Sequence, residues 1–565
     1  MDKILRIDMG AEGGPRVSDV AAGEYAGLGG RGMTSAIVSK EVPALCHPLG
    51  PENKLVIAPG LLSGSAAVIS GRISVGCKSP LTGGIKESNA GGQAGQVLAK
   101  LGYAAIVIEG KPKTEDLYKI FINKDGVKIS VDNSLKMLPN YDLVDKMKAE
   151  FGDKIACISI GPAGEMKLGA ASVAMTDMEL RPTRHAGRGG TGAVMGSKGV
   201  KVIVLDGAGK GFREPKDPEK FRDANNRFAE GLKKHPVTGE ALPKYGTNVL
   251  TNILSEAGGY PTYNFKTGSF PEASKISGES LAEVEIKRGG SATHGCHMGC
   301  IIQCSGIFVD KDGHYVTKQP EYETVWAHGG DCGISDLDAI AKIDFLDDSF
   351  GLDTIEMGAT IAVAMEAGLA KFGDAEAAIN LVKEVGKGTP LGRILGSGMA
   401  NVARIYGIDR VAAVKGQGIP AHAARPLKGW GLTYATSPQG ADHTAGVVDD
   451  ENNLSATGQV EKSRGAQIVT AALDASGFCM FTLLHVSPKL IADMVSSFYG
   501  VKWTEADYME MGKEMLLQER AYNYKAGIGP EADGLPDWMT KEPLPQSNAV
   551  WDVPRKDVLS VFNFE

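Results

Sequence analysis

The feature that most constrains the fold of this chain is a set of four cysteines divided between two distant segments. Cys296, Cys300 and Cys304 recur at every fourth position of HGCHMGCIIQC, and Cys479 ends the segment LDASGFC much later in the chain. Four thiolates are the usual ligand set of a [4Fe–4S] cluster. A ligand set divided in this way requires two remote segments to meet at one metal, so the site must lie inside a large fold.

The cysteine triplet allows more than one local structure and more than one metal. A helix through this segment would align the three thiols on one face, and a turn followed by a helix would also bring them together. Zinc held by the three cysteines and either His294 or His297 is the main alternative to iron–sulfur. The remaining cysteines are isolated, and we expect them to be small buried residues: Cys46, Cys77, Cys157 and Cys332.

Composition limits the class of protein. The chain has 565 residues, which is long enough for several domains, and a formal net charge of -8, which argues against a nucleic-acid partner. Glycine is abundant, with 74 residues, which indicates many sharp turns or close backbone approaches. The sequence contains no apolar run long enough for a membrane span, and MDKILRIDMG does not resemble a secretory signal. We therefore expect a cytoplasmic protein without a membrane span.

The character of the chain changes near residue 207. Before that point, short apolar runs such as KLVIAPG, AAIVIEG, IACISIG and KVIVLDG are bounded by glycine or proline, which predicts strands between turns. After it, segments such as DAIAKIDFLDDSF and TIEMGATIAVAMEAGLAKFG show the period of helices. The sequence predicts an α+β protein with a β-rich N-terminal domain and a mostly helical remainder. No internal repeat is evident.

One short motif occurs twice. DSFGLD begins at Asp348 and DASGFC begins at Asp474, and both read Asp-x-x-Gly followed by an apolar residue. One copy alone is typical of a glycine that ends a helix. Two copies, one of which carries the fourth cysteine, indicate a ligand with two similar halves, each held by a carboxylate and nearby backbone donors.

Two glycine-rich segments resemble nucleotide-binding motifs but lack their context. GLGGRG, residues 27–32, does not follow an apolar strand, and GRGGTGAVMGSKGVK has Gly-Ser-Lys where a P-loop has Gly-Lys-Ser/Thr. Arg188 in the second segment and its backbone donors could still hold another phosphate. Glu323 in PEYET and His443 in YATSPQGADHTAG are candidate acid–base groups beside a metal.

Taken together, GGRG, SGRISVGCKSPLTGG, ESNAGG, AGRGGTGAVMGSKGVKVI, PEYET, the two Asp-x-x-Gly motifs, YATS and ERAYN resemble the aldehyde ferredoxin oxidoreductase family over essentially the whole chain. The resemblance implies three domains: a β base over residues 1–207, a helical domain over 208–400 with the cysteine triplet and the first motif, and a helical domain over 401–565 with the second. It also implies tungsten (or molybdenum) held by two pterins at the domain interface, a [4Fe–4S] cluster, and Mg²⁺ that bridges the pterin phosphates.

The same resemblance implies roles for individual residues. The pterins and their phosphates would contact Arg72, Asn89, Gly91, His185, Ala186, Arg188, Asp348, Leu352, Asp353, Asp474 and Phe478. The cluster ligands would be Cys296, Cys300, Cys304 and Cys479, and the catalytic pair would be Glu323 and His443. The implied reaction is the oxidation of an aldehyde to a carboxylic acid, with electrons passed to ferredoxin or a small iron–sulfur subunit in a homo- or hetero-oligomer.

Some features depart from the family pattern. The triplet has three residues in both gaps, no Glu-x-x-His pair is present, and Ala423-Ala424-Arg425 after His422 replaces the family's Asp-Pro-Arg. The first two departures favour the branch that works with separate iron–sulfur subunits. Two alternatives remain: the catalytic subunit of a reductase of the benzoyl-CoA type, and a zinc-stabilised scaffold subunit of a redox complex.

Overall fold

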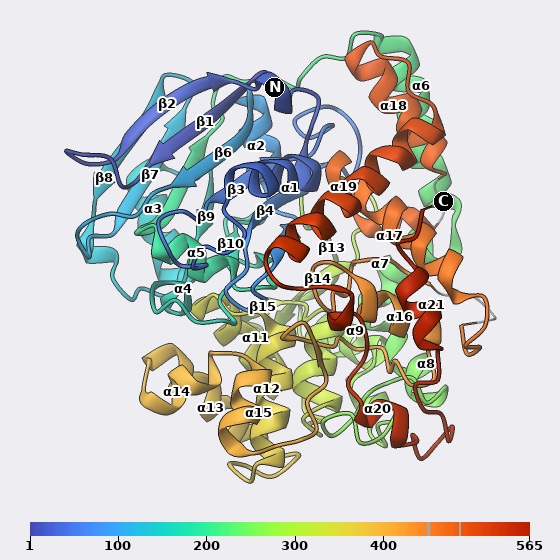
Figure 1. The fold of residues 1–565 in the computed structure, drawn as a ribbon. Coiled ribbons are helices and arrows are strands. Elements are labelled where there is room, and N and C mark those ends of the chain that lie inside the picture. Colours follow the sequence, from blue (N-terminus) through green and yellow to red (C-terminus); the bar gives the residue numbers. More distant parts are fainter. Residues whose placement is uncertain (449–452, 485–486, 565) are drawn as a thin grey trace.

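The computed structural model describes residues 1–448, 453–484 and 487–564. A β-rich base built from the first two hundred residues lies beside and above a larger helical part, and the C-terminal helices pack along the side of the base (Figure 1). The predicted α+β class, with strands first and helices afterwards, is confirmed. No helix of the described residues is long and apolar enough to cross a bilayer.

The first half of the base is a mixed six-stranded sheet. Its strand order is β2-β1-β6-β3-β4-β5, in which β1 and β6 are parallel and all other neighbours are antiparallel. Two helices accompany it, α1 (Gly30–Glu41) and α2 (Ala94–Lys100). The strands are β1 (Lys3–Asp8), β2 (Arg16–Ala21), β3 (Leu55–Pro59), β4 (Ile73–Lys78), β5 (Ile85–Ala90) and β6 (Tyr103–Glu109).

The second half of the base repeats the first. Its order is β11-β10-β9-β12-β7-β8, and again one pair, β7 with β12, is parallel while the other neighbours are antiparallel. Helices α3 (Asn140–Phe151), α4 (Pro162–Glu165) and α5 (Thr191–Ser197) accompany it. The strands are β7 (Tyr118–Asn123), β8 (Gly126–Val131), β9 (Ile155–Ser159), β10 (Val173–Met175), β11 (Arg184–Ala186) and β12 (Val200–Asp206).

The absence of an internal repeat, expected from the sequence, is therefore wrong at the level of topology. Strands β1 to β6 correspond in order and direction to β7 to β12. The repeat leaves little trace in the sequence because a strand needs only the right burial pattern, and KILRID and YKIFIN satisfy similar positions with different residues. The two sheets share one core, which includes Leu5 and Ile57 from the first and Ile120 and Ile203 from the second.

The remainder is mostly helical. A three-stranded sheet, β13 (Ser291–His294), β14 (Ser305–Val309) and β15 (Tyr315–Lys318), and a short pair, β16 (Ala413–Val414) and β17 (Gln417–Gly418), interrupt it. Helix α1 of the base packs against α17 and α19. The helices are α6 (Pro218–Lys234), α7 (Leu242–Tyr245), α8 (Leu250–Glu256), α9 (Gly278–Lys287), α10 (Tyr322–Val325), α11 (Leu337–Phe350), α12 (Thr354–Glu366), α13 (Ala375–Lys387), α14 (Pro390–Leu395), α15 (Met399–Tyr406), α16 (Lys428–Thr436), α17 (Gln459–Ser476), α18 (Pro488–Tyr499), α19 (Glu505–Lys525), α20 (Trp538–Lys541) and α21 (Arg555–Ser560).

Both Asp-x-x-Gly motifs lie at helix C-termini, and both helix ends contact the base at corresponding points. Gly351 ends α11 and Gly477 ends α17, each in the left-handed conformation that favours glycine. Gly161 follows β9, and a Cβ there would lie 2.2 Å from the carbonyl oxygen of Phe350. Gly60 follows the matching strand β3, and a Cβ there would lie 2.1 Å from the Cα of Gly477.

Backbone hydrogen bonds fix these two junctions. The N–H of Ser172 donates to the carbonyl of Gly351 at 2.9 Å, and the N–H of Arg72 donates to the carbonyl of Gly477 at 3.0 Å. The approach of backbone to backbone leaves no room for a side chain at either strand end. The repeat of the base thus positions two helix ends, and the carboxylates they carry, in the same way.

We predict that Gly60→Ala lowers the free energy of unfolding by about 1–3 kcal/mol, because the added methyl meets backbone that cannot move aside cheaply. Gly465→Ala is the control: this glycine lies within α17, and no atom of the described residues outside that helix lies within 4 Å of its Cβ position. Alanine there is expected to be neutral or slightly stabilising, since it favours the helix. Thermal and denaturant unfolding would measure both, and equal stability of the two variants would contradict the steric account of the junction.

Candidate active site

A cavity of about 340 Å³ lies where the base meets the helical part. Most of the residues that the sequence singled out line it: Arg72, Asn89, Gly91, His185, Arg188, Cys296, Cys300, Cys304, Glu323, Asp348, Leu352, Asp353, His443, Asp474 and Cys479. Ala186 and Phe478 are the exceptions. Ala186 pairs with Val173 in the second sheet, and the ring of Phe478 packs on Phe228 with centroids 5.0 Å apart.

The two motif carboxylates meet matching strands of the repeated base. Asp474 Oδ1 accepts a hydrogen bond from Asn89 Nδ2 at 3.2 Å, and Asp348 Oδ1 lies 3.1 Å from His185 Nε2. Asn89 is in β5 and His185 is in the corresponding strand β11. The cavity is therefore lined by two half-sites built on one plan, and the prediction that they hold a ligand with two similar halves stays a prediction.

The other oxygen of each carboxylate faces a buried cation that the sequence analysis did not select. Arg31 Nη1 lies 3.3 Å from Asp474 Oδ2, and Lys318 Nζ lies 2.8 Å from Asp348 Oδ2. Arg31 stands in the GLGGRG segment, where α1 begins, and a Cβ on Gly30 would lie 2.1 Å from the carbonyl oxygen of Asp474. Glycine in that segment thus allows α1 to approach α17 closely. This contact explains why GLGGRG resembles a nucleotide-binding motif although it binds no nucleotide in this interpretation.

The two halves differ in charge. Burial and the nearby Glu87 carboxylate raise the pKa of Asp474 well above its ordinary value, and Arg31 only partly opposes this. Burial also acts to raise the pKa of Asp348, but Lys318 and His185 bring it below its ordinary value. The surroundings of Asp348 therefore favour its ionised form more strongly than the surroundings of Asp474 do.

Arg188 and Asp353 join the base to the helical part beside the first motif. Arg188 Nε lies 3.2 Å from Asp353 Oδ2, and its Nη atoms donate to the carbonyls of Ala441 at 2.6 Å and Gly418 at 2.8 Å. Asp353 also caps α12 by accepting from the N–H of Ile355 at 3.0 Å. The guanidinium is thus largely engaged by protein oxygens, and its contact with a phosphate stays a prediction.

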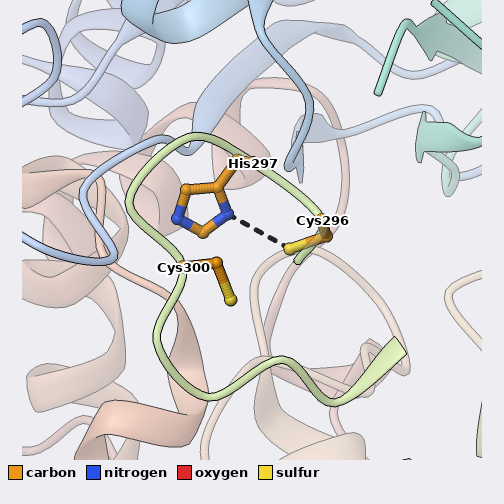
Figure 2. A group of neighbouring side chains, drawn as sticks. All are labelled: Cys296, His297 and Cys300. Carbon is orange, nitrogen blue, oxygen red and sulfur yellow. Dashed lines mark hydrogen bonds between the residues drawn. The ribbon is translucent and has the colours of Figure 1, made fainter. Parts of the chain in front are cut away.

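The cysteine triplet lies in a loop between β13 and β14, so a helix through it is wrong. Gly299 and Gln303 have positive φ angles of 84° and 54°, which break any regular helix there. The Sγ atoms of Cys296 and Cys300 and a ring nitrogen of His297 lie within 4.8 Å of one another (Figure 2). His294, one candidate for a zinc ligand, instead places Nε2 2.9 Å from the carboxylate of Glu179.

Buried cations accompany the four cysteines. Arg72 Nη2 lies 3.5 Å from Cys479 Sγ, and Arg184 donates to Ser305 Oγ at 2.9 Å while it pairs with Glu321 at 3.2 Å. Among the described residues, the Nε atoms of Arg72 and Arg184 are buried without a hydrogen-bond partner. Both arginines line the cavity. Unsatisfied donors beside four thiols fit an anionic cofactor, because they would otherwise cost free energy.

Glu323 and His443 form a close pair at the cavity wall. Glu323 lies in the first turn of α10, and its Oε1 is 2.6 Å from His443 Nδ1. Its Oε2 accepts from the N–H of Ala421 at 3.1 Å. Burial acts to raise the pKa of Glu323, but His443 and the Ala421 N–H bring it below its ordinary value. The carboxylate is therefore ionised at neutral pH and can accept a proton.

A third side chain, which sequence reasoning did not assign to the site, stands behind this pair. His422 Nδ1 lies 4.0 Å from Glu323 Oε1, and its ring stacks on Trp430 with centroids 4.1 Å apart. Burial lowers the pKa of His422 to about 3, and the neighbouring His443 acts in the same direction. The imidazole is neutral at physiological pH. In the sequence, His422 stood out only because it directly precedes Ala423-Ala424-Arg425, which replaces the family's Asp-Pro-Arg.

Comparisons with known proteins agree with this fold and site. Residues 4–207 match the family model described as the aldehyde ferredoxin oxidoreductase N-terminal domain, and residues 223–561 match the model for its domains 2 and 3. The tungsten-containing aldehyde ferredoxin oxidoreductase of Pyrococcus horikoshii is 36% identical over 96% of this chain and 92% of its own length. The enzyme of the same name from Pyrococcus furiosus is 35% identical, over 92% and 88% respectively.

Two further relatives are more distant. A protein of Pyrococcus furiosus named aliphatic sulfonate oxidoreductase, WOR-like subunit, is 27% identical over 92% of this chain and 85% of its own length. The solved active site complex BamBC of benzoyl coenzyme A reductase with 1,5-dienoyl-CoA shares the fold, with a TM-score of 0.81, 19% identity and coverage of 99% of this chain and 93% of that chain.

Fold, site and comparisons together define an oxidoreductase. More particularly, the chain belongs to the aldehyde ferredoxin oxidoreductase family. Membership of this family implies a tungsten–pterin cofactor. The assignment of single residues to that cofactor, and the division of the helical part at residue 400, stay predictions.

We predict that Asp348→Ala and Asp474→Ala each reduce the content of tungsten and pterin in the purified protein. Each change removes the carboxylate of one half-site and leaves Arg31 or Lys318 with one buried carboxylate partner fewer, at a cost of about 1–3 kcal/mol or more. Asp145→Ala, on the exposed face of α3, is the matched control and should retain full cofactor. Metal analysis and pterin fluorescence would measure the losses. Full cofactor in both motif variants would show that the doubled motif is only structural.

Proposed function

We propose that this protein is a tungsten–bispterin enzyme that oxidises an aldehyde to a carboxylic acid and passes the electrons through a [4Fe–4S] cluster to ferredoxin or a small iron–sulfur subunit. The observation that carries the proposal is the gathering, in one cavity, of two matching carboxylate half-sites, four cysteines and an acid–base pair. The names of the curated relatives support the reaction class.

Each part of the cavity suits one part of the cofactor set. The half-site of Asp348, Leu352 and Asp353 would hold one pterin, and the half-site of Asp474 would hold the other, with the Phe478 ring packed outside the cavity on Phe228. The phosphates and bridging Mg²⁺ would be held from the base by Arg72, Asn89, Gly91, His185, Ala186 and Arg188. Cys296, Cys300, Cys304 and Cys479 would ligate the cluster. When bound, the tungsten (or molybdenum) centre supplies a two-electron acceptor and a Lewis acid.

The Glu323–His443 pair would carry out the proton transfers of the reaction. Oxidation of an aldehyde consumes one water and releases the acid, two electrons and two protons. Glu323 is buried and ionised, and so it is suited to accept a proton from water or from the aldehyde C–H. His443, whose Nδ1 is held at Glu323, would help to orient the substrate beside this carboxylate. The Ala421 N–H holds Glu323 in place for this role.

Electrons must leave one at a time, because a [4Fe–4S] cluster carries one electron in each transfer. The loop that carries the cysteine triplet reaches the surface, where Gly299 and Gln303 are exposed. An iron–sulfur partner could therefore approach the cluster from this side. The name of the WOR-like relative as a subunit, and the BamBC complex, support a partner protein for this chain.

We predict that Glu323→Gln lowers kcat by about 10²- to 10⁴-fold, the usual contribution of a positioned acid–base group, while the metal content stays full. The amide can still accept the Ala421 hydrogen bond, so the fold should persist. Glu376→Gln, an exposed change in α13, should retain wild-type kcat.

The measurement is aldehyde-dependent reduction of a viologen and of a ferredoxin, across aliphatic and aromatic aldehydes. A wild-type rate in Glu323→Gln would show that Glu323 takes no part in the proton transfer. A wild-type enzyme that oxidises no aldehyde, but reduces an aryl-CoA thioester with a low-potential donor, would contradict the proposed direction and substrate class.

A further inference from the structure

A histidine stands between the first two cysteines of the triplet and contacts one of their sulfurs. His297 Nδ1 lies 3.1 Å from Cys296 Sγ, and the imidazole points toward the sulfur in the space enclosed by the loop (Figure 2). Its side chain is buried, with 2% exposure, although Gly299 and Gln303 in the same loop are exposed. A polar ring that is fully buried in a loop whose other residues are mostly partly buried or exposed indicates a specific contact.

The base of the protein fixes the position of this ring. Gly71 lies directly against it, and a Cβ at that position would meet His297 Cδ2 at 2.4 Å. Backbone hydrogen bonds hold the loop on both sides of the ring: the Gly92 N–H donates to the carbonyl of Cys296 at 2.9 Å, and the Ile69 N–H donates to the carbonyl of Gly299 at 3.0 Å. The imidazole therefore has little freedom to turn away from the sulfur.

The chemistry of the pair sets the direction of the hydrogen bond. A cysteine that ligates iron is a thiolate and can only accept, so Nδ1 must carry the proton. In the neutral ring Nε2 is then an acceptor. This atom is buried and has no partner among the described residues, and His297 lines the cavity.

We propose that His297 is a positioning residue that donates an Nδ1–H···Sγ hydrogen bond to Cys296 and thereby raises the reduction potential of the iron–sulfur cluster; the inference rests on the proposed function, which places that cluster on these cysteines. Reduction adds negative charge to the cluster and its sulfurs. A donor to a ligating sulfur stabilises the reduced state more than the oxidised state, so the potential rises.

His297 is the most suitable of the sulfur contacts for an experiment. Cys300 Sγ accepts from the backbone N–H of Gln303 at 3.4 Å, and a side-chain substitution does not remove that donor. Arg72, near Cys479, also lines the cavity proposed for the pterins, so its loss would affect two cofactors. The His297 contact can be removed while the ring volume is retained.

The test is an EPR-monitored redox titration of the wild-type protein, His297→Phe and His297→Asn at one pH. Phenylalanine keeps the volume and removes the donor, whereas asparagine places an amide N–H near the position of Nδ1. At the wild-type midpoint, the ratio of reduced to oxidised cluster in His297→Phe should fall about tenfold, a shift of about 59 mV for a one-electron couple. His297→Asn should have a midpoint potential close to that of the wild type, because its amide N–H replaces most of the lost hydrogen bond. Equal potentials in wild type and His297→Phe, at equal iron content, would overturn the inference.

A measurement on the wild-type protein covers the case in which the variants lose iron. With ¹⁵N-labelled histidine, pulsed EPR of the reduced cluster should show a weak nitrogen coupling from a hydrogen-bonded imidazole. No coupling, or the strong coupling of a nitrogen bound directly to iron, would overturn the inference. Failure of the proposed function looks different: the wild-type protein would contain zinc and no iron–sulfur signal.

Discussion

The rest of the structure depends on the close approach of backbone to backbone at two points, where the ends of α11 and α17 meet the base. A strand-end glycine, Gly161 or Gly60, leaves no room for a side chain between strand and helix end. Since the helix ends carry Asp348 and Asp474, the two junctions set the distance and orientation of the carboxylates. The same steric constraint thus acts at both junctions and positions both half-sites. The second junction also positions Cys479, the cysteine that is remote in sequence from the triplet, three residues beyond the end of α17 and beside Arg72.

Buried charge is the second organising element. Arg31 contacts Glu519 at 2.8 Å as well as Asp474, and Lys318 contacts Asp344 at 2.8 Å as well as Asp348. Such buried pairs add little net stability, because the loss of hydration offsets their attraction. We infer that these networks serve to hold the carboxylates in place. The difference between the halves follows from their neighbours, since Glu87 faces Asp474 while Lys318 and His185 face Asp348.

Much of this could be predicted from the sequence, and the failures have physical causes. The strands around Ile57 and Ile203 depend on local patterns, and the sequence predicted them; the Asp-x-x-Gly pattern was compatible with helix ends at Gly351 and Gly477 but did not decide them. The repeat of the base was missed because topology constrains burial rather than residue identity. Arg31 and Lys318 were missed because their partners are hundreds or tens of residues away. The cysteine triplet was open to a helical interpretation because spacing alone does not exclude one; the left-handed Gly299 and Gln303 do.

The proposed function requires the two half-sites to hold two copies of one cofactor beside an iron–sulfur cluster. The most direct measurement is the content of metal and pterin in protein purified without oxygen. We expect two pterins for each tungsten (or molybdenum) and about four iron atoms per chain. Zinc as the sole metal, or a single pterin per chain, would contradict it.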